Sequence, residues 1–197
     1  LEGLVESDPG FVSAINLLGT LYEWDGQSEK GLELFTRSLT IFPQQPDILE
    51  KRGWIYYWTN NKDQALSDVR NAVQLAPEDG RFRVSLGKML FELQRYTDAF
   101  EQFDLGVSLM PEDGYPLSWR GRVYYATGKF DAAKSDLVKA FELNPWDSDI
   151  PFTLGKIAYV EEDYSSAITY LTQTLEMHED HKMALQFRGR AYRDAPR

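Results

Sequence analysis

The hydrophobic and small residues of this chain recur at the spacing of amphipathic helices. In one stretch Leu117 and Gly121 mark a single face of a helix, and Ala133 and Leu137 mark one face of a second helix. Gly128 breaks the pattern between these two faces. This part of the sequence therefore predicts a pair of helices joined by a short turn.

The same two-helix pattern returns along the chain with a period of 34 residues. One glycine keeps this interval throughout: Gly19, Gly53, Gly87, Gly121, Gly155 and Gly189. A proline that ends the second helix of each unit keeps it too: Pro9, Pro43, Pro77, Pro111 and Pro145. Asp79, Asp113 and Asp147 follow three of these prolines and are predicted to cap the next helix. Because glycine removes side-chain bulk where two helices cross, each unit predicts a closely packed antiparallel pair.

This pattern resembles the tetratricopeptide repeat (TPR) family. The period, the glycine and aromatic pair in "GRVYY", the alanine of the second helix and the closing proline all match. The resemblance implies an all-α fold, a right-handed superhelical solenoid of antiparallel helix pairs that forms one array over residues 1–197. The expected divisions are the tail of one repeat at 1–11, full repeats at 12–45, 46–79, 80–113, 114–147 and 148–181, and the first helix of a sixth repeat at 182–197.

The residue before each periodic glycine alternates between leucine and arginine. Sixteen residues after Arg52 stands Asp68, and sixteen after Arg120 stands Asp136. An arginine on a packing face needs a partner, because a desolvated and unpaired charge is strongly unfavourable. We therefore predict two structural ion pairs that fix the register of first and second helices. Anion binding by these arginines is the less favoured alternative.

The residue after each periodic glycine is expected to face the concave surface of the array, which the first helices line. In this column four basic residues follow a tryptophan: Trp54, Lys88, Arg122, Lys156 and Arg190. Aromatic residues three positions further along interleave with them: Tyr57, Phe91, Tyr125 and Tyr159. Arg81 and Tyr115, near the starts of their helices, extend the strip. Alternating cations and rings predict a groove for an extended acidic segment of a partner.

Other interpretations of this strip stay open. Aromatic residues after the glycine belong to the family's usual pattern and pack partly within the array, and basic residues are ordinary on a solvated surface. Family relatives that bind C-terminal carboxylates use paired lysine and asparagine residues on successive first helices. The matching positions here are Asn16 with Thr20, Glu50 with Trp54 and Val84 with Lys88. They lack that set of asparagines, so this ligand type is not supported.

Composition excludes several classes of function. The chain has 21 lysine and arginine residues against 31 aspartate and glutamate residues, and its net charge of −10 makes nucleic acid a poor ligand. It has no cysteine, hence no thiol nucleophile and no cysteine-based zinc site. His178 and His181 bracket two acidic residues, but without a third ligand at a recognisable spacing we predict a solvated turn and no metal site. No phosphate loop, nucleophile elbow or HExxH sequence is present, and no cofactor is expected.

These observations predict a noncatalytic scaffold for a protein or peptide partner, without membrane insertion. No apolar run is long enough to span a bilayer, so a soluble protein is expected, with the cytoplasm as the default compartment. The incomplete repeats at both ends suggest a segment of something longer and motivate two alternatives. The chain could be the regulatory or substrate-recruiting part of a larger enzyme, or a self-assembly module that stacks end to end.

Overall fold

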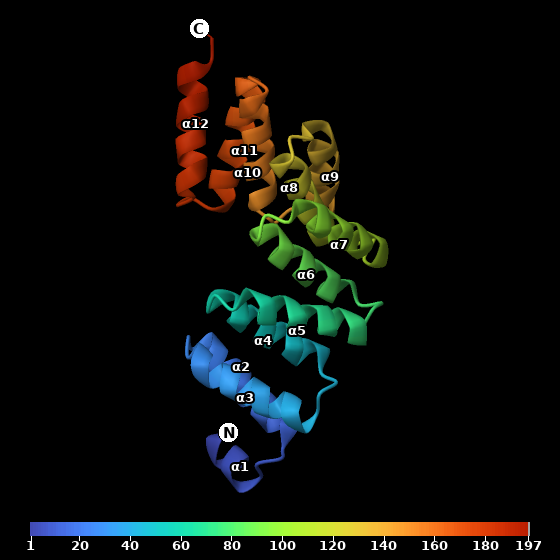
Figure 1. The fold of residues 1–197 in the computed structure, drawn as a ribbon. Helices are drawn as coiled ribbons and strands as arrows, with labels where there is room; N and C mark the ends of the chain where they lie inside the picture. Colours follow the sequence, from blue (N-terminus) through green and yellow to red (C-terminus); the bar gives the residue numbers. More distant parts are fainter. Residues whose placement is uncertain (197) are drawn as a thin grey trace. The chain divides into compact units, whose positions relative to one another are not determined.

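The computed structural model describes residues 1–196, and every regular element in this range is an α-helix (Figure 1). The helices are α1 (Glu2–Ser7), α2 (Val12–Trp24), α3 (Ser28–Ile41), α4 (Pro46–Trp58), α5 (Lys62–Leu75), α6 (Gly80–Glu92), α7 (Tyr96–Leu109), α8 (Gly114–Ala126), α9 (Phe130–Leu143), α10 (Asp149–Val160), α11 (Tyr164–Met177) and α12 (Lys182–Asp194). The even-numbered helices are the first helices of the repeats, and the odd-numbered ones from α3 onward are the second helices. Second helices begin 34 residues apart, which confirms the predicted all-α class and the helix-pair unit.

The chain divides into two compact units, residues 1–89 and 90–197, with the division inside α6. In the first unit α2 packs on α3 and α4 on α5, while α3 also contacts α4. In the second unit α8 packs on α9 and α10 on α11, and α7, α9 and α11 each contact the first helix that follows. A first helix therefore packs against its own second helix and the second helix of the preceding repeat. In addition, α10 contacts both α8 and α12, so these three first helices are neighbours.

Four of the periodic glycines, Gly19, Gly53, Gly121 and Gly155, lie where a first and a second helix cross. A Cβ atom added at Gly121 would lie 2.8 Å from the Leu137 side chain, and one added at Gly155 would lie 2.7 Å from Leu171. Carbon atoms do not pack this closely, so only glycine leaves room for the leucine. Both leucines are fully buried. The structure thus shows the close helix crossing that the small residues predict.

The hydrophobic core of the second unit continues from one repeat to the next. One cluster of buried side chains joins Leu117 and Leu137 of one repeat to Ile150, Leu154 and Ile157 of the following repeat. Burial of apolar area is the main stabilising contribution in such an array, and here each repeat supplies part of its neighbour's core. The first helices are thereby held at fixed positions, and the side chains on their remaining faces are placed by this packing.

The ends of the helices follow the same period. The backbone N–H of Arg81 donates to Asp79 at 3.0 Å, that of Tyr115 to Asp113 at 2.8 Å, and that of Asp149 to Asp147 at 3.0 Å. The turn between the two helices of each pair contains one residue with positive φ: Gly26, Asn60, Gln94, Gly128 and Glu162. Glycine adopts this conformation freely, whereas the left-handed region costs other residues roughly 1–2 kcal/mol.

Candidate functional site

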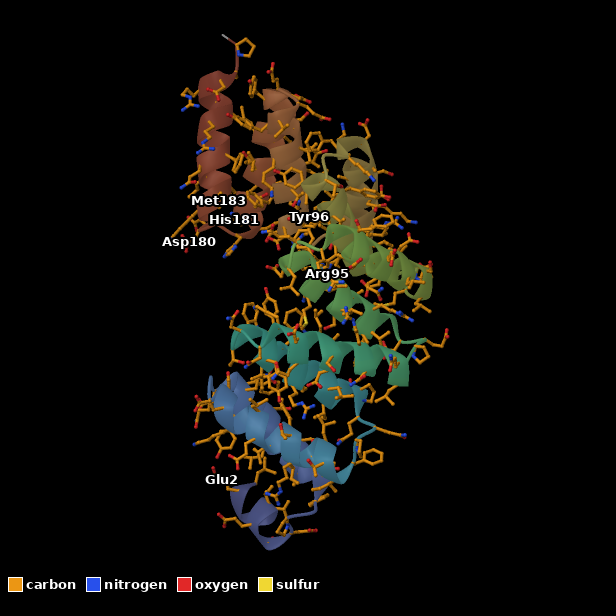
Figure 2. The ribbon with its side chains drawn as sticks, viewed as in Figure 1. Glu2, Arg95, Tyr96, Asp180, His181 and Met183 are labelled. Atoms are coloured by element: carbon orange, nitrogen blue, oxygen red, sulfur yellow. The ribbon has the colours of Figure 1, made fainter. Side chains whose placement is uncertain are left out.

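The residues of the predicted strip lie on successive first helices. Trp54 and Tyr57 are on α4; Arg81, Lys88 and Phe91 are on α6; Tyr115, Arg122 and Tyr125 are on α8; Lys156 and Tyr159 are on α10; and Arg190 is on α12. Trp54, Tyr57, Arg81 and Lys88 belong to the first unit, and the others belong to the second. Figure 2 draws the side chains along both units.

In the first unit, Trp54 contacts two other residues of the predicted strip, Tyr57 and Lys88. Trp54 is half-buried, and its indole Nε1 donates a hydrogen bond of 2.9 Å to the Oγ of Ser85. The Nζ of Lys88 lies 5.4 Å from the centre of the Trp54 ring, within the range of cation–π attraction. Tyr57 is buried and packs edge-on against Trp54, with ring centres 5.6 Å apart. Tyr57 therefore supports the Trp54 ring and offers little surface of its own.

Two further side chains border this group. Arg81 is exposed, and its Nη2 lies 2.6 Å from Asp79 and 3.6 Å from Asp47. Its hydrogen bonds lower the pKa of Asp79. Trp58, which was not among the residues predicted from the sequence, stacks on Trp54 with ring centres 6.2 Å apart and is 74% exposed. Because Trp58 follows Trp54 by four residues on one helix, helical spacing could have found it.

In the second unit Arg122 lies between an aromatic ring and a carboxylate. Its Cζ is 4.4 Å from the centre of the Trp119 ring, and its Nη2 donates to the Oδ2 of Asp149 at 2.5 Å. Its Nε is buried and has no acceptor among residues 1–196. Neither neighbour was predicted from the sequence. Trp119 lies one helical turn before Arg122, whereas Asp149 comes from the next repeat and no periodic feature marks it.

Lys156 is held among aromatic rings. Its Nζ lies 4.4 Å from the centre of the Tyr125 ring and 4.8 Å from that of Phe152. Burial lowers the pKa of Lys156, the charge of Arg122 lowers it further, and Asp149 acts in the opposite direction. Burial also raises the pKa of the Tyr125 hydroxyl. Phe152, another residue not predicted from the sequence, lies one helical turn before Lys156 on α10.

The remaining predicted residues have different surroundings. Tyr159 donates from its hydroxyl to Asp194 at 2.7 Å and packs on Phe187, so it is engaged within the chain. Arg190 is exposed, with its Cζ 5.5 Å from the centre of the Phe187 ring. Tyr115 is also exposed, and it packs edge-on against Trp119, as Phe91 does at a ring distance of 5.6 Å. We call Arg122, Lys156 and Arg190, with the rings of Trp119, Tyr125, Phe152 and Phe187, the cation–aromatic row.

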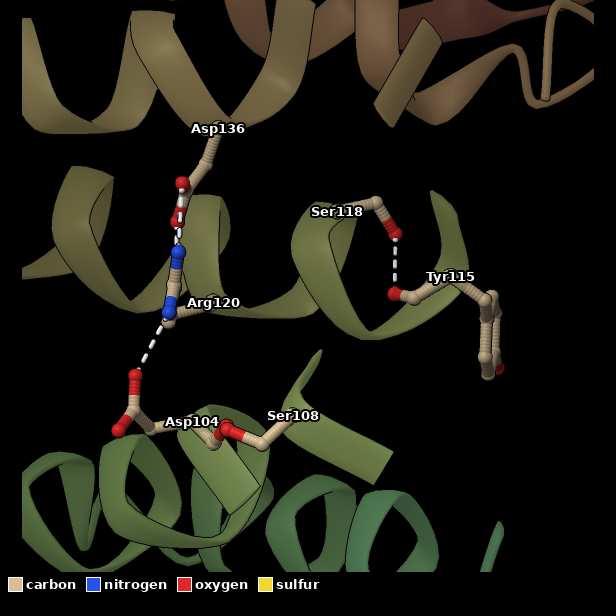
Figure 3. A network of polar contacts seen from close by, with 6 residues as sticks. All are labelled: Asp104, Ser108, Tyr115, Ser118, Arg120 and Asp136. Carbon is tan, nitrogen blue, oxygen red and sulfur yellow. Dashed lines mark hydrogen bonds and ion pairs between the residues drawn. The ribbon is translucent and has the colours of Figure 1, made fainter. Parts of the chain in front are cut away.

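The two alternating arginines bind aspartates on the neighbouring second helices. The Nε and Nη2 of Arg52 donate to the two carboxylate oxygens of Asp68, at 2.7 and 2.8 Å. Arg120 makes the same bidentate contact with Asp136, at 2.7 and 2.9 Å (Figure 3). Hydrogen bonds to the aspartates raise the pKa of both arginines. These pairs keep both guanidinium groups occupied inside the helix packing.

A third contact distinguishes the two pairs. The Nη1 of Arg120 also donates to Asp104 on α7, at 2.6 Å (Figure 3). At the equivalent position before Arg52 stands Thr36, whose Oγ1 lies 3.5 Å from the Nη1. Asp104 precedes Arg120 by 16 residues, so a pattern built on the residues that follow each arginine does not reveal it.

The histidines lie at the connection between α11 and α12, where Figure 2 labels His181 and Asp180. The Nδ1 of His181 accepts the backbone N–H of Ala184 at 3.1 Å and so caps α12. Within residues 1–196 no three His, Cys, Asp or Glu side chains gather as metal ligands would. Nor does any helix of that range combine the length and the apolar character needed to cross a membrane.

The sequence matches models of a known repeat family. Two family models, both described as tetratricopeptide repeat, match the chain. One matches residues 50–113 and 152–197, more than half of the chain, and the other matches residues 117–145. A search of curated proteins found no match.

Solved structures share the fold at low sequence identity. YrrB, described as a TPR protein with an unusual peptide-binding site, is 19% identical with a TM-score of 0.69, over 95% of this chain and 97% of its own. PilF of Pseudomonas aeruginosa is 21% identical with a TM-score of 0.83, over 92% and 83% of the two chains. PilW, described as a type IV pilus biogenesis factor, is 18% identical with a TM-score of 0.79, over 93% and 90%. At these identities the similarity shows the fold alone.

Proposed function

We propose that this chain, which belongs to the tetratricopeptide repeat family, is a noncatalytic scaffold that binds an extended acidic segment of a protein partner along its first helices. The cation–aromatic row of the second unit carries this proposal. Its three cations, Arg122, Lys156 and Arg190, stand on α8, α10 and α12, and each lies over at least one aromatic ring. Rings of this kind supply rigid contact area, and cations select carboxylates.

The spacing of the row suits an extended chain. Neighbouring first helices pack at about 8–10 Å between axes, and an extended peptide advances about 3.3 Å per residue. One cation would then meet roughly every third residue of the ligand. A segment with acidic residues at that interval and apolar residues between them would place carboxylates at the cations and apolar side chains on the rings. YrrB, with its unusual peptide-binding site, offers a precedent for peptide binding on this fold.

The cation–aromatic row presents three cations, although the chain as a whole is acidic. Because the net charge is −10, the long-range electrostatic field of the chain repels an acidic partner. Only close contacts with the cations of the row attract such a partner. Such contacts act over about 8 Å at physiological salt. The proposal therefore requires a ligand that reaches the cations directly. In the first unit, taken by itself, Lys88 and Trp54 form a contact of the same kind.

The proposal is tested with a fluorescent peptide that has glutamate at every third position and leucine between. Arg122→Gln with Arg190→Gln is expected to weaken binding by about tenfold or more, because two charge contacts are lost. The matched control is Arg95→Gln with Lys134→Gln, which removes two cations of the same unit that form ion pairs and do not belong to the row. Fluorescence anisotropy gives the dissociation constants. Equal weakening by both double variants, or no binding of the peptide at low salt, would contradict the proposal.

A further inference from the structure

One cavity of the second unit is lined in part by residues of the cation–aromatic row. It has a volume of about 260 Å³, and α6, α8 and α10 contribute its lining, which includes Phe91, Arg122, Tyr125, Asp149, Phe152 and Lys156. Pockets for drug-sized ligands and cofactors measure about 300–1,000 Å³. This cavity therefore suits a single side chain better than a complete small molecule.

The charges around the cavity are not balanced. Its lining holds two cations, Arg122 and Lys156, against one carboxylate, that of Asp149. The carboxylate contacts Arg122 at 2.5 Å, whereas no carboxylate oxygen among residues 1–196 lies within 4.0 Å of the Nζ of Lys156. The buried Nε of Arg122 also has no acceptor in that range. A second carboxylate would therefore find donors on both sides of the cavity.

The position of Asp149 suggests how the cavity accommodates that ligand. Asp149 is the first residue of α10, and its side chain is 52% exposed. A carboxylate in the first turn is also favoured by the helix dipole and by free backbone N–H groups, so it has a stable position without Arg122. It can therefore turn towards solvent when another carboxylate arrives.

We propose that this cavity binds one internal aspartate or glutamate side chain of the partner, in competition with Asp149 for Arg122. This inference rests on the proposed function and names the chemistry of one position in its ligand. The incoming carboxylate accepts hydrogen bonds from Arg122 and Lys156, while Tyr125 and Phe152 contact the apolar part of the same side chain. An internal residue fits better than a chain terminus, because the row continues past the cavity to Phe187 and Arg190 on α12.

The first experiment tests the cavity without any peptide. Propionate, and its uncharged equivalent propionamide, are titrated into the whole chain while the Nε–H signal of Arg122 is followed by NMR. Propionate is expected to shift this signal to saturation, and propionamide is expected to leave it in place. Asp149→Asn, which keeps the shape of the side chain, is expected to tighten propionate binding several-fold by removing the competitor. Lys156→Gln is expected to weaken it several-fold, and the control Lys134→Gln to leave it unchanged.

The second experiment distinguishes the source of the carboxylate. Acetyl-Gly-Leu-Glu-Leu-Gly-amide carries only an internal carboxylate, and acetyl-Gly-Leu-Gln-Leu-Gly with a free end carries only a terminal one. The first peptide is expected to bind at least several-fold more tightly. The inference is overturned if propionamide acts like propionate, if Asp149→Asn weakens binding, or if the terminal carboxylate is preferred. These results would leave the proposed function standing wherever the longer acidic peptide still depends on Arg190. Propionate binding combined with no binding of that longer peptide would contradict the proposed function alone.

Discussion

Arg52 and Arg120 occupy equivalent positions but depend on their aspartates to different degrees. Each guanidinium has an 18% exposed side chain and a bidentate aspartate partner on a second helix. Arg120 has another carboxylate, Asp104, at 2.6 Å, whereas the Nη1 of Arg52 reaches only the hydroxyl of Thr36 at 3.5 Å. Removal of the aspartate would therefore leave Arg52 without a carboxylate and leave Arg120 with one.

We predict that Asp68→Ala lowers the free energy of unfolding by about 3 kcal/mol, because it leaves a desolvated cation. Asp136→Ala is expected to cost clearly less, about 1–2 kcal/mol, because Asp104 remains in contact with Arg120. Urea denaturation of the two variants measures the difference. An equal loss of stability in both would show that Asp104 contributes nothing.

The first repeat supplies a control for this prediction. It carries Leu18 and Leu34 where the second repeat carries Arg52 and Asp68. Replacement of an ion pair by apolar residues of similar volume is often neutral or stabilising. Arg52→Leu with Asp68→Leu is therefore expected to recover most of the stability that Asp68→Ala loses. A double variant as unstable as the single one would argue against an electrostatic cause.

Lys156 is expected to reduce the stability of the fold. Its pKa is lowered in the folded state, chiefly by burial, so at neutral pH folding places a charged group in an unfavourable environment. Lys156→Met should raise the free energy of unfolding at neutral pH by up to about 1 kcal/mol, a modest gain because water screens the exposed part of the ammonium. The unfolded chain keeps its proton to higher pH, so the wild type gains stability as the pH approaches 10.5 and the advantage of the variant shrinks. Urea denaturation at several pH values measures this trend, and a less stable variant at neutral pH would contradict it.

At the scale of the helix pair, alanine substitutions at two periodic glycines distinguish the effect of close packing on stability from the effect of helix propensity. A methyl group at Gly121 would meet Leu137 at 2.8 Å, whereas nothing lies within 4 Å of the same position at Gly189 in the part of the chain that the structure describes. Gly121→Ala is therefore expected to cost about 1–2 kcal/mol, the overpacking cost less the gain in helix propensity. Gly189→Ala is expected to be neutral or to stabilise by up to about 1 kcal/mol. Thermal unfolding compares the two, and stabilisation by Gly121→Ala would disprove the close crossing.

The sequence predicts these helices well because a local signal repeats. The apolar period and the proline at each helix end place the helix pairs, and the packing of Gly121 on Leu137 follows from the same pattern. The turns were harder to predict. Gly26 and Gly128 indicate a left-handed residue, but Gln94 and Glu162 adopt the same conformation without any such preference. There the packing of the two helices imposes the backbone conformation.

The candidate site could be predicted only in part, for a related reason. Arg122 and Lys156 stand in a regular column after the periodic glycine, so the sequence reveals them. Asp149 stands in a column of mixed composition and binds Arg122 of the preceding repeat, which a pattern within one repeat does not show. Phe152 contacts Lys156 on its own helix, but its column is also mixed in composition, so no periodic feature marks it. Tyr57 and Tyr159 share a regular column with Tyr125, yet one is buried and the other is bonded to Asp194. Position in a repeat therefore identifies the helix face but not what each side chain contacts.

For the molecule as a whole, the central claim is that an acidic partner binds to first helices, although the chain carries a net charge of −10. The most direct test is NMR mapping of backbone amide shifts during titration with the glutamate–leucine peptide. We predict that the largest saturable shifts fall on α8, α10 and α12, around Arg122, Lys156 and Arg190. Shifts confined to the second helices α9 and α11, or shifts that do not saturate, would contradict it.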